Sequence, residues 1–589
     1  MCGIVGVLAF EDSHFRVQPR HMERMRDTMV HRGPDGAGLW ISPDQRVGLG
    51  HRRLSIIDLS TVANQPMGNE DGTLWVTFNG EIYNHAQVRA ELERLGGHQW
   101  KTDHSDTEVI LHAFEQWGID CLQKLRGMFA IALWDARREH LWLIRDRIGE
   151  KPLYYSIHHG LLQFASEIKA LLADPDQKRE VNEEGLFHYL SFLTAPAPQT
   201  LFDGIRKLPP ATWMRIDKHG RIATHCYWDV WDHTEPLTGV PDREVAERVL
   251  TELRSTVRLL KVSDVPVGVF LSGGIDSSTN AALFSEGEGG PVRTFSIGYQ
   301  GELSSYRNEF AYARLVARQV GAEHQERHLC LDDLLDFLPR MIELHDEPIG
   351  DPVCVPVYYV SKLARDNGVV VCQVGEGADE LFCGYPTWLR YWRLQRLLGR
   401  LPAAGLACRA ARSGLNLLGL GRVRLREALR RVTIGRPMFW GSADCLADSE
   451  KLPLLSARLR RRFARHTAWD IVAPIHQRFQ QHAWEPSVLN WMSYLDLRTR
   501  LPESLLMRVD KMGMGVSLEG RVPFLDHKFV ELAMSIPEAV KLRHGSLKHI
   551  LKEAVRGVIP DEVIRRRKQG FGVPVRDWLF DRLGERVHD

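Results

Sequence analysis

VFLSGGIDSS, residues 269–278, is the stretch that decides the fold of the second half of this chain. Its apolar start predicts a buried strand, its glycines a turn, and its end the first turn of a helix. The glycines allow the backbone to wrap around a phosphate, to which Ser272, Ser277 and the first helical N–H groups can donate. The segment therefore predicts an anion-binding loop between a strand and a helix.

The sequence on either side of this loop repeats the strand–helix rhythm. VRTFSIGY (292–299) predicts a strand, EFAYARLVARQVGA (309–322) a helix, and GVVVCQVGEGADELF (368–382) another strand and turn. Apolar strands that alternate with helices indicate a parallel sheet covered on both faces. From about 386 to 480 the chain is helical and rich in arginine, and helices continue to about 556. We predict an α/β domain with a helical C-terminal part.

The first 205 residues follow a different pattern. Apolar or alternating runs such as GIVGVLAF (3–10) and LWVTFNG (74–80) predict strands, and only 83–95 and 106–117 have helical spacing. Strands without a βαβ rhythm favour a layered α+β domain. We expect one domain over 2–205, a linker with closing strands over the Pro- and Gly-rich 206–244, and a second domain over 245–589.

Composition narrows the class of protein. The 589 residues include 76 Lys and Arg against 75 Asp and Glu, a net charge of +1 that argues against a nucleic-acid partner. No apolar run is long enough to span a membrane. Nine scattered cysteines without a CxxC pair favour a reducing compartment, so we expect a cytoplasmic protein. The opening MCGIVGVLAF lacks the basic start of a signal peptide and predicts a buried strand.

Cys2 is the first chemically unusual residue. If Met1 is removed, Cys2 carries a thiol next to a free amine, whose pKa of about 7.7–8.0 suits a base. HRGPDGAG (31–38), HRRLSIID (51–58), FNGEIYNH (78–85) and SDTEVI (105–110) follow in order. With MCGIVG they resemble the glutaminase domain of the class II amidotransferases, an N-terminal-nucleophile hydrolase family. The resemblance covers essentially all of 2–205.

The resemblance implies roles for six residues. Cys2 would supply the thiolate that attacks the glutamine carboxamide, and Asn79 with the Gly80 backbone N–H would donate hydrogen bonds to the resulting oxyanion. Arg53 would bind the α-carboxylate of glutamine. Asp106 and Glu81 would bind its α-ammonium group.

The phosphate loop carries a second resemblance. SGGxDS after a strand resembles the pyrophosphate loop of the N-type ATP pyrophosphatases, and the absence of GxxxxGK[ST] excludes a P-loop. GEGADE (375–380), RVDKMGMGVSLEGRVPFLD (508–526) and RRRKQGFGVP (565–574) extend the resemblance to the asparagine synthetase family. That family adenylates a carboxylate with MgATP and releases pyrophosphate, so ATP and Mg²⁺ are the implied cofactors.

Site residues of the second domain are also implied by this resemblance. Asp276 and Asp379 would hold Mg²⁺, while Glu376 and Lys568 would be catalytic and Lys548 a weaker candidate for a pyrophosphate contact. The expected ATP-binding residues are Leu271, Ser272, Gly273, Gly274, Asp276, Ser277, Ile297 and Gly375.

Several residues depart from the family pattern on the acceptor side. Val374 stands where the family commonly has Ser, FGGY has become FCGY (382–385), and GMG (513–515) is altered. The charged residues that we expect to hold a zwitterionic acceptor are Glu376, Asp379, Arg508, Asp510 and Arg521. These charges favour aspartate and hence a glutamine-dependent asparagine synthetase, whereas the departures favour another carboxylate, such as a uronic-acid sugar or a peptide.

Two further alternatives are less consistent with the sequence. A β-lactam synthetase has a degenerate glutaminase half, but Cys2, Arg53, Asn79 and Asp106 are intact here. A regulatory protein with an inactive synthetase half would not need Asp276, Glu376, Asp379 and Lys568. The expected partners are small molecules, and a homodimer stays open. The arginine-rich 390–472 is expected to form a solvated helical face.

Overall fold

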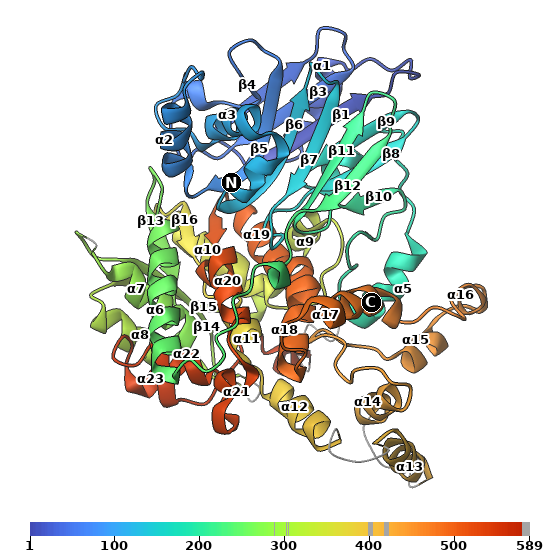
Figure 1. Cartoon of the computed structure of the whole chain (residues 1–589), viewed down its shortest axis with the longest axis vertical. Helices are drawn as coiled ribbons and strands as arrows, with labels where there is room; N and C mark the ends of the chain where they lie inside the picture. Colours follow the sequence, from blue (N-terminus) through green and yellow to red (C-terminus); the bar gives the residue numbers. More distant parts are fainter. Residues whose placement is uncertain (288, 302, 304–305, 399–403, 418–422, 580–589) are drawn as a thin grey trace.

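The computed structural model describes residues 1–287, 289–301, 303, 306–398, 404–417 and 423–579. A strand-rich N-terminal region lies above a helix-rich C-terminal region (Figure 1). None of the described helices combines the length and apolar character needed to cross a bilayer.

Two antiparallel six-stranded sheets form the N-terminal region. The first sheet has the order β10 (Ile205–Lys207), β8 (Tyr154–His158), β9 (Leu161–Ala165), β1 (Gly3–Ala9), β3 (Val47–Arg53) and β2 (Gly36–Ile41). The second has the order β12 (Ile222–Cys226), β11 (Thr212–Asp217), β7 (His140–Arg145), β6 (Gly127–Asp135), β5 (Leu74–Ile82) and β4 (Met67–Gly68). β11 and β12 come from the stretch expected to hold a linker and closing strands, and they complete the second sheet.

Alternation along β1 shows how these layers pack. Ile4 and Leu8 face the second sheet in one apolar cluster, whereas Val5 and Val7 face the opposite way, towards α1 (Pro19–Asp27). α4 (Ile168–Leu172) lies with α1 on that outer side, and α2 (His85–Leu95) and α3 (Asp106–Trp117) cover the second sheet. The strands are thus buried on both faces, which explains their continuous apolar runs. The predicted α+β layered domain is confirmed.

The C-terminal region is built on a fully parallel sheet. Its order is β15 (Glu323–Leu329), β14 (Arg293–Tyr299), β13 (Val267–Phe270), β16 (Val371–Gln373) and β17 (Glu519–Arg521). The helices that flank it are α6 (Asp242–Leu259), α7 (Ile275–Ser285), α8 (Phe310–Gln319), α9 (Leu331–His345), α10 (Cys354–Asp366) and α19 (Leu506–Met514). The predicted α/β domain is confirmed.

Strand order in this sheet determines where a ligand site can form. β13 is central, with β14 on one side and β16 on the other, so the chain direction across the sheet reverses next to it. The carboxyl ends of parallel strands at such a switch point leave a crevice. VFLSGGIDSS and GEGADE both follow strands that end at this crevice.

α5 (Glu183–Phe192) precedes β10 in the chain and contacts α15 (Asp448–Leu454) of the C-terminal part. The other helices of that part are α11 (Ala378–Phe382), α12 (Pro386–Leu398), α13 (Ala404–Leu417), α14 (Val423–Thr433), α16 (Ala457–Arg462), α17 (Trp469–His482), α18 (Val488–Arg498), α20 (His527–Met534), α21 (Glu538–Lys541), α22 (His549–Ala554), α23 (Asp561–Arg565) and α24 (Val575–Leu579).

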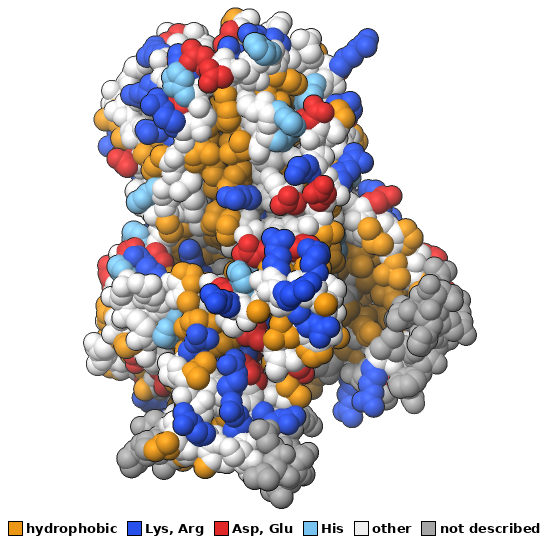
Figure 2. All heavy atoms as spheres, turned by 90° about the vertical axis from the view of Figure 1, so that its right-hand side faces the viewer, with side chains coloured by type: hydrophobic (Ala, Val, Ile, Leu, Met, Phe, Trp, Pro, Cys, Tyr) orange, Lys and Arg blue, Asp and Glu red, His pale blue; other side chains and the backbone are white. Residues whose placement is uncertain are grey.

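Part of the arginine-rich stretch is engaged in ion pairs. Arg458 and Arg462 of α16 both pair with Glu183 of α5, and Arg431 pairs with Asp444 at 2.6 Å. Figure 2 shows Lys and Arg side chains distributed over the lower half of one face among apolar and acidic groups. Among the described residues, α16 has no buried side chain, as expected for a solvated helix.

A buried guanidinium joins the two regions. Arg32 is fully buried, and its Nε donates to the Cys2 carbonyl at 2.9 Å. Nη1 donates to Glu167 at 3.0 Å and to Asp510 of α19 at 2.8 Å, while Nη2 donates to the other oxygen of Asp510 at 3.1 Å. Arg126 makes a second bidentate contact, to Asp526, at 2.7 Å for both bonds. The start of β1, next to Cys2, is thereby tied directly to α19 of the second region.

Asp510→Asn should destabilise the whole protein, because it leaves the buried Arg32 charge only partly compensated. We expect the free energy of unfolding to fall by about 3 kcal/mol, the lower end of the cost of breaking a buried ion pair. Urea unfolding followed by tryptophan fluorescence measures the change. Asp27→Asn, which removes a surface partner of Arg26, is the matched control and should cost less than about 1 kcal/mol. Equal losses in both variants would contradict this account of the interface.

Candidate active sites

Cys2 lies immediately before β1 in the buried interior of the N-terminal region. Its backbone N–H donates to Asn79 Oδ1 at 2.9 Å, and its Sγ lies 3.9 Å from the Leu54 carbonyl oxygen. Burial raises the pKa of the Cys2 thiol, an effect that the positive chain terminus opposes. The thiol therefore needs a nearby base to become a nucleophile at neutral pH.

Asn79 and Gly80, on β5, are the residues that the resemblance assigns to the oxyanion. Asn79 is fully buried, and its Nδ2 has no hydrogen-bond partner, so a donor next to Cys2 stays unsatisfied. Gly80 has a φ of 153°, and a Cβ there would lie 2.0 Å from the Met128 carbonyl oxygen. Only glycine fits at this position. An orphaned buried donor costs free energy, which a bound anion would recover.

Arg53, Glu81 and Asp106 converge on the same region. Arg53 donates to the Ser60 carbonyl at 2.7 Å and to Asn64 Oδ1 at 2.8 Å, so its guanidinium is fixed by the loop after β3. Asp106, the first residue of α3, accepts from the Ile82 N–H at 3.0 Å. Burial, followed by the carboxylates Glu519 and Asp106, raises the pKa of Glu81 well above its usual range. A cation placed among these carboxylates would favour their ionised forms.

The start of the chain contacts the second region. The Met1 ammonium lies 3.0 Å from Glu519 Oε2, with both side chains fully buried, and Arg521 holds the other oxygen of Glu519 at 2.7 Å. Two expected acceptor-binding residues are therefore placed elsewhere. Arg521 pairs with Glu519, and Asp510 pairs with Arg32. Neither residue lines the cavity of the second region that is described next. The sequence positions of Arg521 and Asp510 do not reveal whether these residues line the cavity or pair with charges elsewhere.

A cavity of about 770 Å³ opens at the carboxyl ends of β13, β14 and β16. It is lined by nearly every residue that the sequence assigns to ATP: Leu271, Ser272, Gly274, Asp276, Ser277, Ile297 and Gly375. Gly273 is the exception: it belongs to the same loop but does not line the cavity. Its φ of 73° and the Ala313 N–H, which a Cβ would approach to 2.7 Å, explain why glycine is required there.

Two lysines and two aspartates form a charged cluster in this cavity. Lys548 Nζ lies 2.6 Å from Asp276 and 2.5 Å from Asp379, and Lys568 Nζ lies 2.7 Å from the other oxygen of Asp379. Although burial opposes it, the two ammonium groups hold the pKa of Asp379 well below its usual range. In return, Asp379 raises the pKa of Lys568 against the effect of burial.

This cluster fits the donor set that Mg²⁺ requires. The carboxylates of Asp276 and Asp379 converge on one point, because a single ammonium group contacts both of them. Carboxylate oxygens are the ligands that Mg²⁺ prefers, with phosphate oxygens completing the shell. Lys548, which the sequence marked only as a weaker candidate, is thus central to the cluster.

A second ion-pair system reaches the wall of the cavity through Arg508 and Glu376. Arg508 Nη2 lies 2.5 Å from Glu376, and Nη1 lies 2.5 Å from Asp351. The π-helical turn Leu501–Leu505 joins α18 to α19 and, with Arg500, contributes to this wall. Sequence reasoning missed Asp351 and Arg500, for which no motif gives a signal, and Arg32, which stands in the HRG of 31–33.

Only one of the unusual acceptor-side residues reaches the cavity. Val374 lines it, but Cys383, Gly513 and Gly515 do not. Gly513 faces the Leu518 carbonyl and Gly515 faces Leu344, so a larger side chain would clash with protein and not with a ligand. The expectation that all these departures shape the acceptor pocket is wrong for these three residues.

A buried thiol beside an unsatisfied amide donor, together with a phosphate loop and paired aspartates in a second domain, defines an ATP-dependent ligase that hydrolyses glutamine. Comparisons with known proteins agree. The family model described as asparagine synthase matches residues 248–589, and that of the glutamine amidotransferase domain matches 1–228. The chain belongs to the asparagine synthase family.

Individual relatives span almost the whole chain. It is 35% identical to asparagine synthetase [glutamine-hydrolyzing] 1 of Bacillus subtilis, over 100% of this chain and 89% of the relative. A putative asparagine synthetase of Mycobacterium bovis is 34% identical, over 95% of this chain and 85% of its own length. Amidase chry2 of Gibberella zeae is 28% identical, over 96% of this chain and 87% of its own length. The synthetase relatives support glutamine-dependent amidotransferase chemistry, and the amidase name leaves the acceptor open.

Asn79→Asp should remove the unsatisfied donor and keep the side-chain shape and the oxygen that Cys2 contacts. We expect glutaminase kcat to fall by about 10²–10³-fold, as for the loss of one oxyanion donor, with a smaller change in KM. Steady-state release of glutamate from glutamine is the measurement. Asn367→Asp, a distant surface change, is the control. An unchanged kcat in Asn79→Asp would rule out the oxyanion role.

Proposed function

We propose that the protein is a glutamine-dependent asparagine synthetase. It takes ammonia from glutamine in the N-terminal region and transfers it to an aspartyl adenylate in the C-terminal cavity. The products are asparagine, glutamate, AMP and pyrophosphate. The observation that carries this proposal is that Cys2 lies beside the unsatisfied Asn79 Nδ2 in one region, while the other holds a 770 Å³ cavity lined by residues of the loop 272–277 and by Glu376 and Arg508.

In the proposed glutaminase reaction, Met1 is removed and the amine of Cys2 accepts the proton of its own thiol. The Cys2 sulfur attacks the carboxamide carbon of glutamine, forming a tetrahedral oxyanion that Asn79 Nδ2 and the Gly80 N–H stabilise. Collapse releases ammonia and leaves a thioester, which water hydrolyses to glutamate. Arg53 holds the α-carboxylate of the substrate, while Asp106 and Glu81 face its α-ammonium group.

In the proposed synthetase reaction, Ser272, Ser277 and the first N–H groups of α7 hold the phosphates of ATP. Lys548 and Lys568 offset the charge that develops on the leaving pyrophosphate. Asp276 and Asp379 are the groups that would hold Mg²⁺. When bound, the ion neutralises phosphate charge and aligns the triphosphate for attack by the acceptor carboxylate.

Aspartate as the acceptor is supported by the ion pairs at the far end of the cavity. An aspartate molecule needs a cationic partner for its α-carboxylate and an anionic partner for its α-ammonium. Arg508 with Glu376 and Asp351 offers both signs within one connected system. A polar site of this kind rejects analogues that lack one charge, because its own groups would stay unpaired.

A second candidate is the same reaction on another carboxylate, such as a uronic-acid sugar or a peptide. Val374 favours it, because an apolar side chain lines the cavity where the family commonly has a hydroxyl. Relatives named amidase are also consistent with a family in which the acceptor varies.

Pyrophosphate release from MgATP should depend on L-aspartate. We expect at least about 10²-fold lower kcat/KM with succinate, which lacks the ammonium group that Glu376 and Asp351 would pair. A coupled pyrophosphate assay with ammonium chloride as the nitrogen source measures the synthetase reaction independently of glutaminase. The panel includes uronic-acid sugars and a peptide acid. A response to one of these without a response to aspartate would replace asparagine synthesis by the second candidate.

Asp379→Asn and Cys2→Ala should separate the two half-reactions. Asp379→Asn keeps the shape but removes one carboxylate charge, so synthesis should fall by about 10²-fold or more with both glutamine and ammonium, while glutaminase activity persists. Cys2→Ala should abolish glutamine-driven synthesis and spare ammonium-driven synthesis. Asp366→Asn, which breaks a surface pair with Lys362, is the control. Loss of ammonium-driven synthesis in Cys2→Ala would contradict the two-site mechanism.

A further inference from the structure

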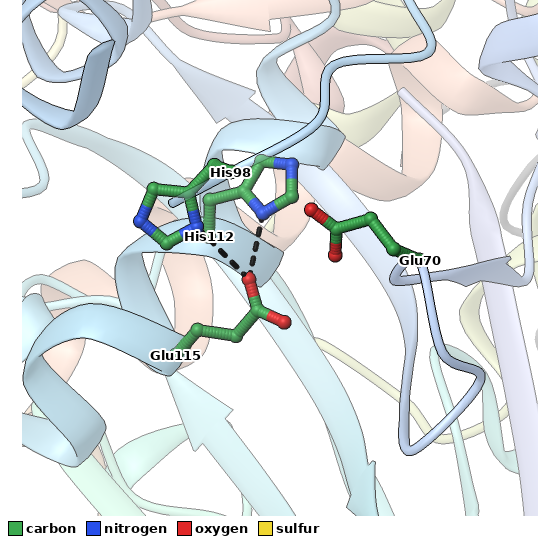
Figure 3. Close-up of side chains that lie close together, drawn as sticks. All are labelled: Glu70, His98, His112 and Glu115. Carbon is green, nitrogen blue, oxygen red and sulfur yellow. Dashed lines mark hydrogen bonds and ion pairs between the residues drawn. The ribbon is translucent and has the colours of Figure 1, made fainter. Parts of the chain in front are cut away.

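Two histidines and two glutamates meet outside both active sites, on the N-terminal region (Figure 3). Each offers one potential ligand atom, and these atoms all lie within 4.8 Å of one another. Glu70 follows β4, His98 lies between α2 and α3, and His112 with Glu115 belongs to α3. Within the described part of the chain, this is the one group of three or more His, Cys, Asp or Glu side chains with such spacing.

The side chains point at a common centre. Glu115 Oε2 lies 2.7 Å from His112 Nδ1 and 3.2 Å from His98 Nδ1, and Figure 3 shows the Glu70 carboxylate directed towards the same space. Ligand atoms of a tetrahedral Zn²⁺ site stand at about 2.0–2.2 Å from the metal, hence at about 3.4 Å from one another. The distances from Glu115 Oε2 to the two imidazole nitrogens differ from that spacing by less than 1 Å.

The carboxylates are already oriented for such a role. Asn69 Nδ2 donates to Glu115 Oε1 at 2.7 Å, and the Gln99 N–H donates to Glu70 Oε1 at 2.6 Å. In Glu70, one oxygen accepts a backbone hydrogen bond. In Glu115, Oε1 accepts from Asn69 and Oε2 contacts both imidazoles, and a bound ion would replace the contacts of Oε2. Ligating carboxylates in metal sites are held by outer hydrogen bonds in the same way.

On each imidazole, Nδ1 contacts Glu115, so Nδ1 is the nitrogen available to an ion at the centre of the cluster. The side chains of His98 and His112 are only 8% and 1% exposed, and Nε2 of each is buried without a hydrogen-bond partner. Nε2 of His112 lies 3.8 Å from Glu108 Oε1, and Glu108 is fixed by the N–H groups of Lys101 and Thr102 at 2.7 and 2.8 Å. Metal binding at Nδ1 would place the imidazole proton on Nε2, directed at this carboxylate.

We propose that Glu70, His98, His112 and Glu115 bind one divalent transition-metal ion, with Zn²⁺ as the best-suited ion. Imidazole nitrogens with carboxylate oxygens suit Zn²⁺, whereas Mg²⁺ takes oxygen ligands almost alone. The two glutamates balance the charge of the ion. The site links the turn after β4 and the segment 96–105 to α3, whose first residue is Asp106. It is therefore a structural site that fixes the position of α3, the helix that begins at Asp106.

Isothermal titration of chelator-treated full-length enzyme with zinc chloride tests the proposal. We expect one equivalent of tight binding, absent with magnesium chloride, and visible d–d bands of a four-coordinate ion when Co²⁺ replaces Zn²⁺. Loss of an outer hydrogen-bond partner lowers metal affinity by about 10–100-fold. His98→Gln and Glu70→Gln each remove a direct ligand, so each should lower the zinc affinity by more than that. His219→Gln, which removes a surface histidine paired with Glu11, should have no effect.

Glu70 keeps the test decisive, because its side chain is exposed and Glu70→Gln should not prevent folding. An equivalent of zinc bound by the Cys2 thiol would persist in Glu70→Gln and His98→Gln, so only the difference from the wild type counts. The proposal is overturned if the wild type binds no equivalent of zinc that these variants lose. The cluster would then be a network of hydrogen-bonded ion pairs alone.

Discussion

The buried guanidinium of Arg32 is the contact on which the relation between the two regions depends. It donates hydrogen bonds to the backbone carbonyl of Cys2, to Glu167 of the N-terminal region and to Asp510 of α19. A fully buried charge is tolerated only when its hydrogen-bonding groups are matched, and here the matching groups belong to both regions. The start of β1 is therefore linked to α19, the helix that also places Arg508 at the wall of the cavity in the second region.

The two sites illustrate different ways of preparing for charge. In the glutaminase site, Asn79 Nδ2 is left without a partner and Gly80 adopts a conformation that only glycine fits, so the site is organised before any oxyanion forms. In the synthetase cavity, Asp276 and Asp379 are already neutralised by Lys548 and Lys568. A bound nucleotide with its metal would exchange partners within that cluster, because phosphate oxygens compete for the lysines and the cation competes for the aspartates.

Local motifs carried most of the site information. SGGIDSS and GEGADE each follow a strand of one parallel sheet, so their residues had to meet at the same edge, and the cavity lining agrees with this expectation. Residues selected only by charge within a motif were harder to place. Arg508 and Asp510 stand two positions apart on α19, and one faces the acceptor end of the cavity while the other faces Arg32. Asp351 belongs to no motif, so only its contact with Arg508 reveals it.

By itself, the sequence determined the two fold classes, the family and the strand-to-helix position of the phosphate loop. These properties depend on periodicity and on short segments, and neighbouring residues set them. Only the tertiary structure decided which charges compensate one another: Arg32 with Asp510, Lys548 between two aspartates, and His98 with α3. Such pairings join segments up to several hundred residues apart. A buried charge takes whichever partner the packing brings within reach, and no local pattern records that choice.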